Sequence, residues 1–135
     1  MTRHVLVVLS NAADGCDDEF NDWYDHQHLG DVLAVDGFVA AQRFRLSDAQ
    51  LRADEPMPYR YLAVYEIEAD DLNTPLQGLI SGIASGAIPL SEALDLQRLS
   101  TYTLHADHRS RDRLTRRSPR RDGGGYSGYI ARPGR

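Results

Sequence analysis

The sequence is poor in three features that each identify a class of protein. It has one cysteine, Cys16, which excludes a disulfide framework and favours a reducing compartment. The longest apolar run near its start, residues 5–9, is too short for a signal-peptide core or a membrane span. It contains no P-loop and no GxSxG element, and its glycine run at 123–125 follows no predicted strand and so is no phosphate loop. We therefore expect a soluble cytoplasmic protein, with one domain in its 135 residues.

Lysine is also absent, so arginine carries all the basic charge. Nine of the 15 arginines lie from Arg109 onward, where only Asp112 and Asp122 oppose them. This asymmetry predicts an acidic folded domain, residues 1–106, and an Arg- and Gly-rich tail, residues 107–135. The tail's composition favours a segment that is mobile or packs on the acidic dimer, and the alternative is contact with nucleic acid or a protein partner.

The domain itself alternates strand and helix patterns in the order β-α-β-β-α-β. The expected strands are 5–9, 38–46, 59–68 and 96–105, and the expected helices are 17–35 and 70–83. This order predicts an α+β, ferredoxin-like fold, in which a four-stranded antiparallel sheet carries two helices on one face. The other face has no helix to cover it, which favours a homodimer through that open face.

The first predicted helix carries polar side chains within its apolar stripe. At about 100° per residue, Phe20, Tyr24, His28, Asp31 and Val35 fall on one face. Burying His28 and Asp31 is costly unless they are paired or face a cavity. Both interpretations remain open: the pair lines a pocket, or it forms a structural latch beneath the helix end.

The strand at 38–46 shows a similar irregularity. On the strand face that carries Phe44, Gln42 is the only polar residue. Arg43 and Arg45 point to the other face. On the next strand, Tyr61 and Tyr65 share a face. If these faces meet the first helix, the sequence predicts a cavity with a few polar groups in apolar walls.

A metal site is not expected from this sequence. His26 and His28 differ by about 200° on a helix, so they cannot bind one ion together. We interpret His26 as a solvated histidine.

The first helix and the strand after it carry a recognisable pattern. It is Phe20-x-x-Trp23-Tyr24-x-x-x-His28-Leu29-x-Asp31-Val32-Leu33-x-Val35-x-Gly37-Phe38, followed by Ala41-x-Arg43-Phe44. This resembles the dimeric α+β barrel superfamily, and most closely the EthD-like small barrel proteins of bacterial degradation and secondary-metabolism clusters. The resemblance implies a homodimer with a ligand cleft between sheet and helices, lined by His28 and Tyr24. Members of the superfamily include cofactor-free monooxygenases, polyketide cyclases, lactone isomerases and haem-binding enzymes.

These observations favour an enzyme without a bound organic cofactor that acts on a small apolar oxygenated molecule, as an isomerase, cyclase, dehydratase or monooxygenase. His28 would move a proton next to a carbonyl, Tyr24 would stabilise the oxyanion, and Asp31 would orient His28. The expected substrate contacts are Phe20, Trp23, Gln42, Phe44, Tyr61 and Tyr65. The alternatives are a non-catalytic binding or interaction module, and a haem-handling barrel with His28 as axial ligand.

Overall fold

The computed structural model describes residues 2–107 and 130–131, and its main feature is a single antiparallel sheet. The strands are β1 (Thr2–Ser10), β2 (Phe38–Arg45), β3 (Tyr61–Ala69), β4 (Ser100–His105) and β5 (Ile130–Ala131). Their order is β4-β1-β3-β2-β5, and every neighbouring pair is antiparallel. The first four strands have the ferredoxin-like order, so the predicted fold class is confirmed.

The two-residue strand β5 was not expected from the sequence. Ala131 pairs with Ala40 and Ile130 with Ala41, so β5 adds to the edge that β2 would otherwise leave open. The prediction that the tail is mobile or packed on a dimer falls mostly on residues that lie outside the described part of the chain.

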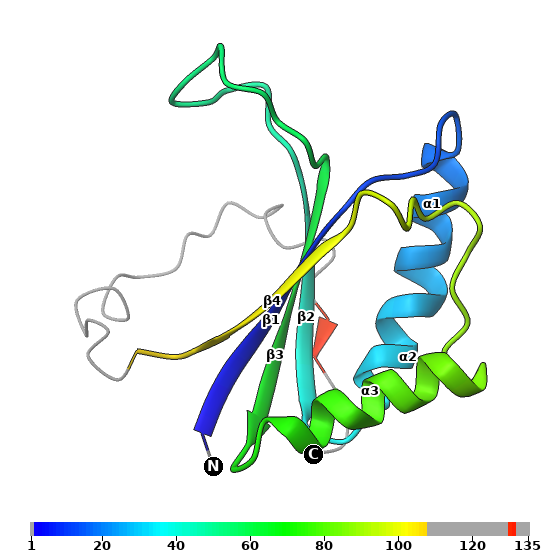
Figure 1. Ribbon diagram of the computed structural model, residues 1–135, viewed down its shortest axis with the longest axis vertical. Coiled ribbons are helices and arrows are strands. Elements are labelled where there is room, and N and C mark those ends of the chain that lie inside the picture. Colours follow the sequence, from blue (N-terminus) through cyan, green and yellow to red (C-terminus); the bar gives the residue numbers. More distant parts are fainter. Residues whose placement is uncertain (1, 108–129, 132–135) are drawn as a thin grey trace.

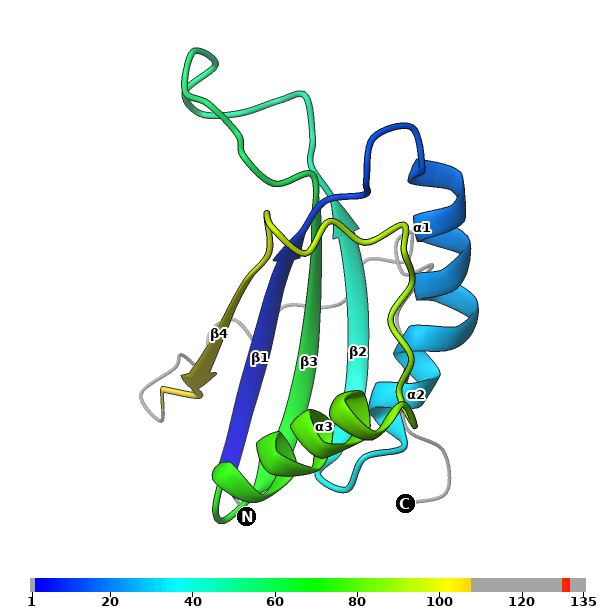
Figure 2. The ribbon, with the colours of Figure 1, turned by 45° about the vertical axis from the view of Figure 1, so that its right-hand side comes forward.

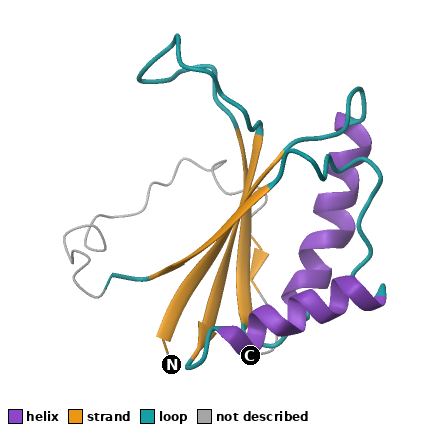
Figure 3. Cartoon of the chain, viewed as in Figure 1, coloured by secondary structure: helices purple, strands orange, loops and turns teal. Residues whose placement is uncertain are grey.

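The helices lie on one face of the sheet, as predicted (Figures 1 and 3). The first helix consists of α1 (Asp17–Trp23), a π-helical turn η1 (Tyr24–His28) and α2 (Leu29–Leu33), and the second is α3 (Asn73–Ser85). The first helix runs beside the strands, whereas α3 crosses near one end of the sheet (Figures 1 and 2). The two helices therefore leave part of this face uncovered between them.

The core forms where the first helix packs on β2 and β3. Phe20, Leu29, Phe38 and Ile67 are completely buried there, and Tyr65 is almost so. Burying such large side chains is the main stabilising term for this layer, at about 1.5–3 kcal/mol each. The tyrosines of β3 lie on the buried face, as its alternating sequence predicted.

Helix α3 approaches its neighbours closely at two glycines. A Cβ on Gly78 would lie 2.9 Å from Cγ1 of Val35, and one on Gly82 would lie 2.6 Å from Cδ1 of Ile88. The glycines therefore allow close packing against the chain that follows the first helix and against the loop after α3.

The orientation predicted for β2 is wrong beyond its first residue. A β-bulge between Phe38 and Ala40 shifts the register against β3, so Ala41, Arg43 and Arg45 pair with the inward residues of β3. Gln42 and Phe44 consequently lie on the open face of the sheet, away from the helices. One extra residue in a strand reverses the face of every side chain that follows it.

Strand β4 begins at Ser100, four residues later than its predicted start at 96. The carboxylate of Asp95 accepts hydrogen bonds from the backbone N–H groups of Gln97 and Arg98 and from Nε of Arg98 at 2.9 Å. This local turn competes with strand pairing and keeps the preceding residues in a loop.

Candidate functional site

The first helix changes its periodicity at the predicted site. The π turn from Tyr24 to His28 holds one more residue than an α-helical turn would, so four-residue intervals stay on one face. Phe20, Tyr24, His28 and Val32 are all buried, with 8% or less of their surface exposed, whereas Asp31 is only half-buried. The π turn therefore replaces Asp31 by Val32 on the face that points to the sheet. Such turns occur often at functional sites.

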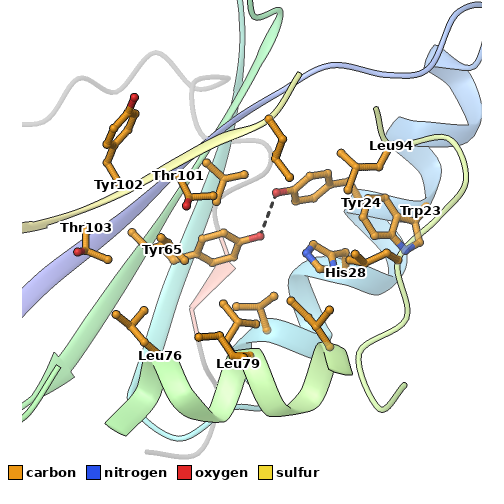
Figure 4. A pocket seen from close by; sticks show the side chains of 17 residues that line it. Trp23, Tyr24, His28, Tyr65, Leu76, Leu79, Leu94, Thr101, Tyr102 and Thr103 are labelled. Carbon is orange, nitrogen blue, oxygen red and sulfur yellow. Dashed lines mark hydrogen bonds between the residues drawn. The ribbon is translucent and has the colours of Figure 1, made fainter. Parts of the chain in front are cut away.

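A pocket of about 410 Å³ lies between the first helix, α3 and the sheet (Figure 4). Its walls include Leu6 and Val8 of β1, Trp23, Tyr24, His28 and Val32 of the first helix, Tyr65 of β3, Leu76, Leu79, Ile80 and Ile83 of α3, and Thr101 and Thr103 of β4. Among the described residues that line it, none is Asp, Glu, Lys or Arg. The size and the apolar walls suit a small neutral molecule.

Three polar groups meet inside these apolar walls. The hydroxyl of Tyr65 donates to that of Tyr24 at 3.3 Å, and both point into the pocket (Figure 4). The His28 imidazole lines the pocket beside them, and its Nδ1 is fully buried with no hydrogen-bond partner among the described residues. A buried polar atom without a partner is costly, which marks this position as a candidate functional site.

Aromatic rings fix the orientation of the His28 imidazole. It stacks on Trp23 with ring centroids 4.5 Å apart and meets the edge of Tyr24 at 5.0 Å. Burial lowers the pKa of His28 to about 4, because no nearby group compensates the loss of water around the charged form. The imidazole is therefore neutral at pH 7 and able to accept a proton or a hydrogen bond.

The Tyr24 hydroxyl is also neutral at pH 7. Burial raises its pKa, although the hydrogen bond from Tyr65 and the charge of Arg43 act in the opposite direction. Since Tyr65 donates to Tyr24, the proton of Tyr24 remains free to be donated to a ligand oxygen.

Behind Tyr24, on the side away from the pocket, lies Arg43. Its guanidinium carbon is 4.5 Å from the centroid of the Tyr24 ring, 5.4 Å from that of Phe20 and 5.5 Å from that of Tyr61. It donates to Oδ1 of Asp25 and to Oδ1 of Asn21, each at 2.9 Å. These contacts connect β2 to the first helix.

Four of the predicted site residues meet at the pocket: Trp23, Tyr24, His28 and Tyr65. Phe20 and Tyr61 lie behind it around Arg43, and Tyr61 donates to Oδ2 of Asp17 at 2.6 Å. Gln42 and Phe44 lie on the opposite face of the sheet.

The predicted pairing of Asp31 with His28 does not form. Oδ2 of Asp31 and Nδ1 of His28 are both buried, and neither has a hydrogen-bond partner in the described part of the chain. The physical reason is the π turn, which moves Asp31 off the face that carries His28.

Sequence reasoning missed Thr101, Thr103 and Arg43. The two threonines share one face of the predicted last strand, which could have marked them as a wall of the pocket. Arg43 was expected to point away, because nothing in the local sequence signals the bulge in β2.

Within the described residues, no three His, Cys, Asp or Glu side chains gather in a way that could hold a metal ion. Nor does the described part of the chain contain a helix long and apolar enough to cross a membrane.

Comparison with solved structures finds similarity to the crystal structure of an ethyl tert-butyl ether D (EthD) family protein from Bacillus halodurans C-125. The TM-score is 0.51 at 15% sequence identity, and the match covers 76% of this chain and 96% of that chain. No protein-family model matches the chain, and no curated protein does. The predicted resemblance to EthD-like proteins is thus confirmed at the level of the fold.

Proposed function

We propose that this protein is a cofactor-free enzyme that acts on a small, neutral, apolar oxygenated molecule. The observation that carries the proposal is the pocket itself, where the His28 imidazole and the Tyr24 hydroxyl lie in walls whose described residues include no Asp, Glu, Lys or Arg. A neutral imidazole accepts a proton from a carbon next to a carbonyl, and the electron pair left behind moves to the carbonyl oxygen. Tyr24 donates a hydrogen bond to that oxygen.

This proton transfer is a step common to the reaction classes that the sequence favours. Isomerases and cyclases use an enolate of this kind, and dehydratases and cofactor-free monooxygenases begin from a similar carbanion. The pocket supports this shared step.

The experiment is hydrogen–deuterium exchange of 2-tetralone, a neutral enolisable ketone, followed by NMR in deuterated buffer. We expect the protein to accelerate exchange next to the carbonyl, and His28→Gln to reduce that acceleration about 100-fold or more. His26→Gln is the matched control, because His26 is an exposed histidine on the same helix. Binding of 2-tetralone without faster exchange would contradict the proposed catalytic activity and support a non-catalytic binding module. Absence of binding would contradict the proposal that the pocket is a site for such ketones.

We further infer that the protein functions as a homodimer through the open face of the sheet. Phe44, Tyr102 and Leu104 expose 44%, 58% and 49% of their surface there, beside the half-buried Val7 and Val64. Such a face is costly in water and complements itself under two-fold symmetry. Light scattering should give a dimer for the wild type and a monomer for Val64→Arg. A monomeric wild type would contradict this inference.

A further inference from the structure

The positive charge of Arg43 lies directly behind the tyrosine that faces the pocket. Its guanidinium is 4.5 Å from the centroid of the Tyr24 ring, with Phe20 and Tyr61 as its other ring contacts. The side chain is only 10% exposed, and its Nε has no hydrogen-bond partner in the described part of the structure. Because water is largely excluded, the charge acts on its surroundings with little screening.

Two hydrogen bonds hold this charge in place against the first helix. Nη1 donates to Asp25 and Nη2 to Asn21, each at 2.9 Å, so the guanidinium is held by one residue before Tyr24 in the chain and one after it. Asp25 is 49% exposed, so water weakens its opposition to the arginine charge. A net positive potential therefore remains at the Tyr24 ring.

The pocket side of the same ring lacks any charge of its own. Its lining holds no Asp, Glu, Lys or Arg among the described residues, and the Tyr24 hydroxyl is a donor available to a ligand. The effect of Arg43 extends beyond the ring it touches, because its charge lowers the pKa of both Tyr24 and Tyr65 against the larger effect of burial.

We propose that Arg43 is a positioning residue that acts through Tyr24: it holds the ring from behind and favours negative charge on a ligand oxygen bound at the Tyr24 hydroxyl. The inference rests on the proposed function and narrows the substrate class. Ligands of this pocket are phenols or enolisable ketones, whose oxygen becomes anionic in the site, rather than alcohols or ethers, whose oxygen does not.

The test uses 4-nitrophenol as a probe, because its absorbance reports whether the bound molecule is phenol or phenolate. The titration midpoint of the bound probe is compared between variants of the full-length protein. Arg43→Gln should raise the midpoint by about half a pH unit or more, because it removes a nearby positive charge. Arg43→Lys keeps the positive charge, so its midpoint should lie close to that of the wild type.

Asp25→Asn supplies a second variant that leaves the arginine in place. It removes the carboxylate that opposes Arg43, so the midpoint should fall, in the direction opposite to Arg43→Gln. If the role of Arg43 were purely structural, the two variants would not shift the midpoint in opposite directions. Arg45→Gln is the matched control, because it removes an exposed arginine from the same strand and should change the midpoint little.

Equal midpoints for the wild type, Arg43→Gln and Asp25→Asn would overturn this inference and leave the proposed function standing. A shift for Arg45→Gln as large as that for Arg43→Gln would overturn it as well. Absence of 4-nitrophenol binding to the wild type would overturn the inference together with the proposed substrate class, and 2-tetralone exchange would then decide separately on the proposed function.

Discussion

On one side of the Tyr24 ring lies the pocket, and on the other lies Arg43. The pocket has no charged side chain among its described residues and is lined by the neutral imidazole of His28. The Arg43 side has a full charge, and two of its nitrogens donate to helix oxygens at 2.9 Å. The same ring therefore separates the region that we propose binds a ligand from a region that holds the helix to the sheet. We expect substitutions of Arg43 to affect stability most, and removal of a pocket hydroxyl to affect binding most.

The largest effect should come from the Arg43 side. Arg43→Ala removes two hydrogen bonds and three ring contacts from a side chain that is 10% exposed, and we expect the free energy of unfolding to fall by about 3 kcal/mol. Urea denaturation measures this loss. Arg45→Ala, at an exposed position of β2, should change stability by about 0.5 kcal/mol or less. Similar losses for both variants would contradict the proposed role of the buried Arg43 contacts in holding the helix to the sheet.

On the pocket side, His28 should make stability depend on pH. Its pKa falls from 6.5 to about 4 on folding, so the unfolded chain binds the proton first as the pH decreases. The contribution is present above pH 6.5 and is lost toward pH 4. Between pH 7.5 and pH 5 the wild type should lose about 2 kcal/mol more than His28→Met. Denaturation curves at both pH values test this, with His26→Met as control. Equal losses in wild type and His28→Met would show that His28 is not buried in its neutral form.

A smaller effect is expected when one hydroxyl is removed from the pocket. Tyr24→Phe keeps the ring against Arg43 but removes the donor to a ligand oxygen, so the affinity for 2-tetralone should fall up to about tenfold. The free energy of unfolding should fall by only about 1 kcal/mol, through the lost hydrogen bond with Tyr65. Calorimetric titration and thermal melting separate the two quantities. A large loss of stability with unchanged affinity would reverse the assignment of the two sides.

The smallest effect should come from the open face of the sheet. Gln42→Leu should leave 2-tetralone binding within about twofold, because the bulge in β2 places this side chain away from the pocket. Thr101→Val is the matched variant on the pocket side, because Thr101 lines the pocket and valine is similar to threonine in size but lacks the hydroxyl. If Gln42→Leu weakens binding more than Thr101→Val does, the register of β2 is wrong.

The sequence was sufficient for features that depend on a regular period. Strand β3 alternates without interruption, so its buried tyrosines were predicted correctly, and the order of elements was enough to predict the ferredoxin-like sheet. Two single-residue irregularities account for the main errors at the site. The bulge in β2 places Arg43 instead of Gln42 on the inner face, and the π turn places Val32 instead of Asp31 on the face toward the sheet. Neither irregularity shows in the periodicity of the sequence, which fits a regular strand and a regular α-helix equally well.

The π turn also suggests that chain length, as well as residue identity, specifies this site. A π turn is equivalent to one residue inserted into an α-helix. Ordinary α geometry over the same residues would rotate everything after the turn by up to about 100° relative to Phe20. Asp31 rather than Val32 would then point to the sheet, although each side chain of the site would still be present in the chain. A shift of one residue thus separates a binding pocket from an ordinary helix–sheet contact.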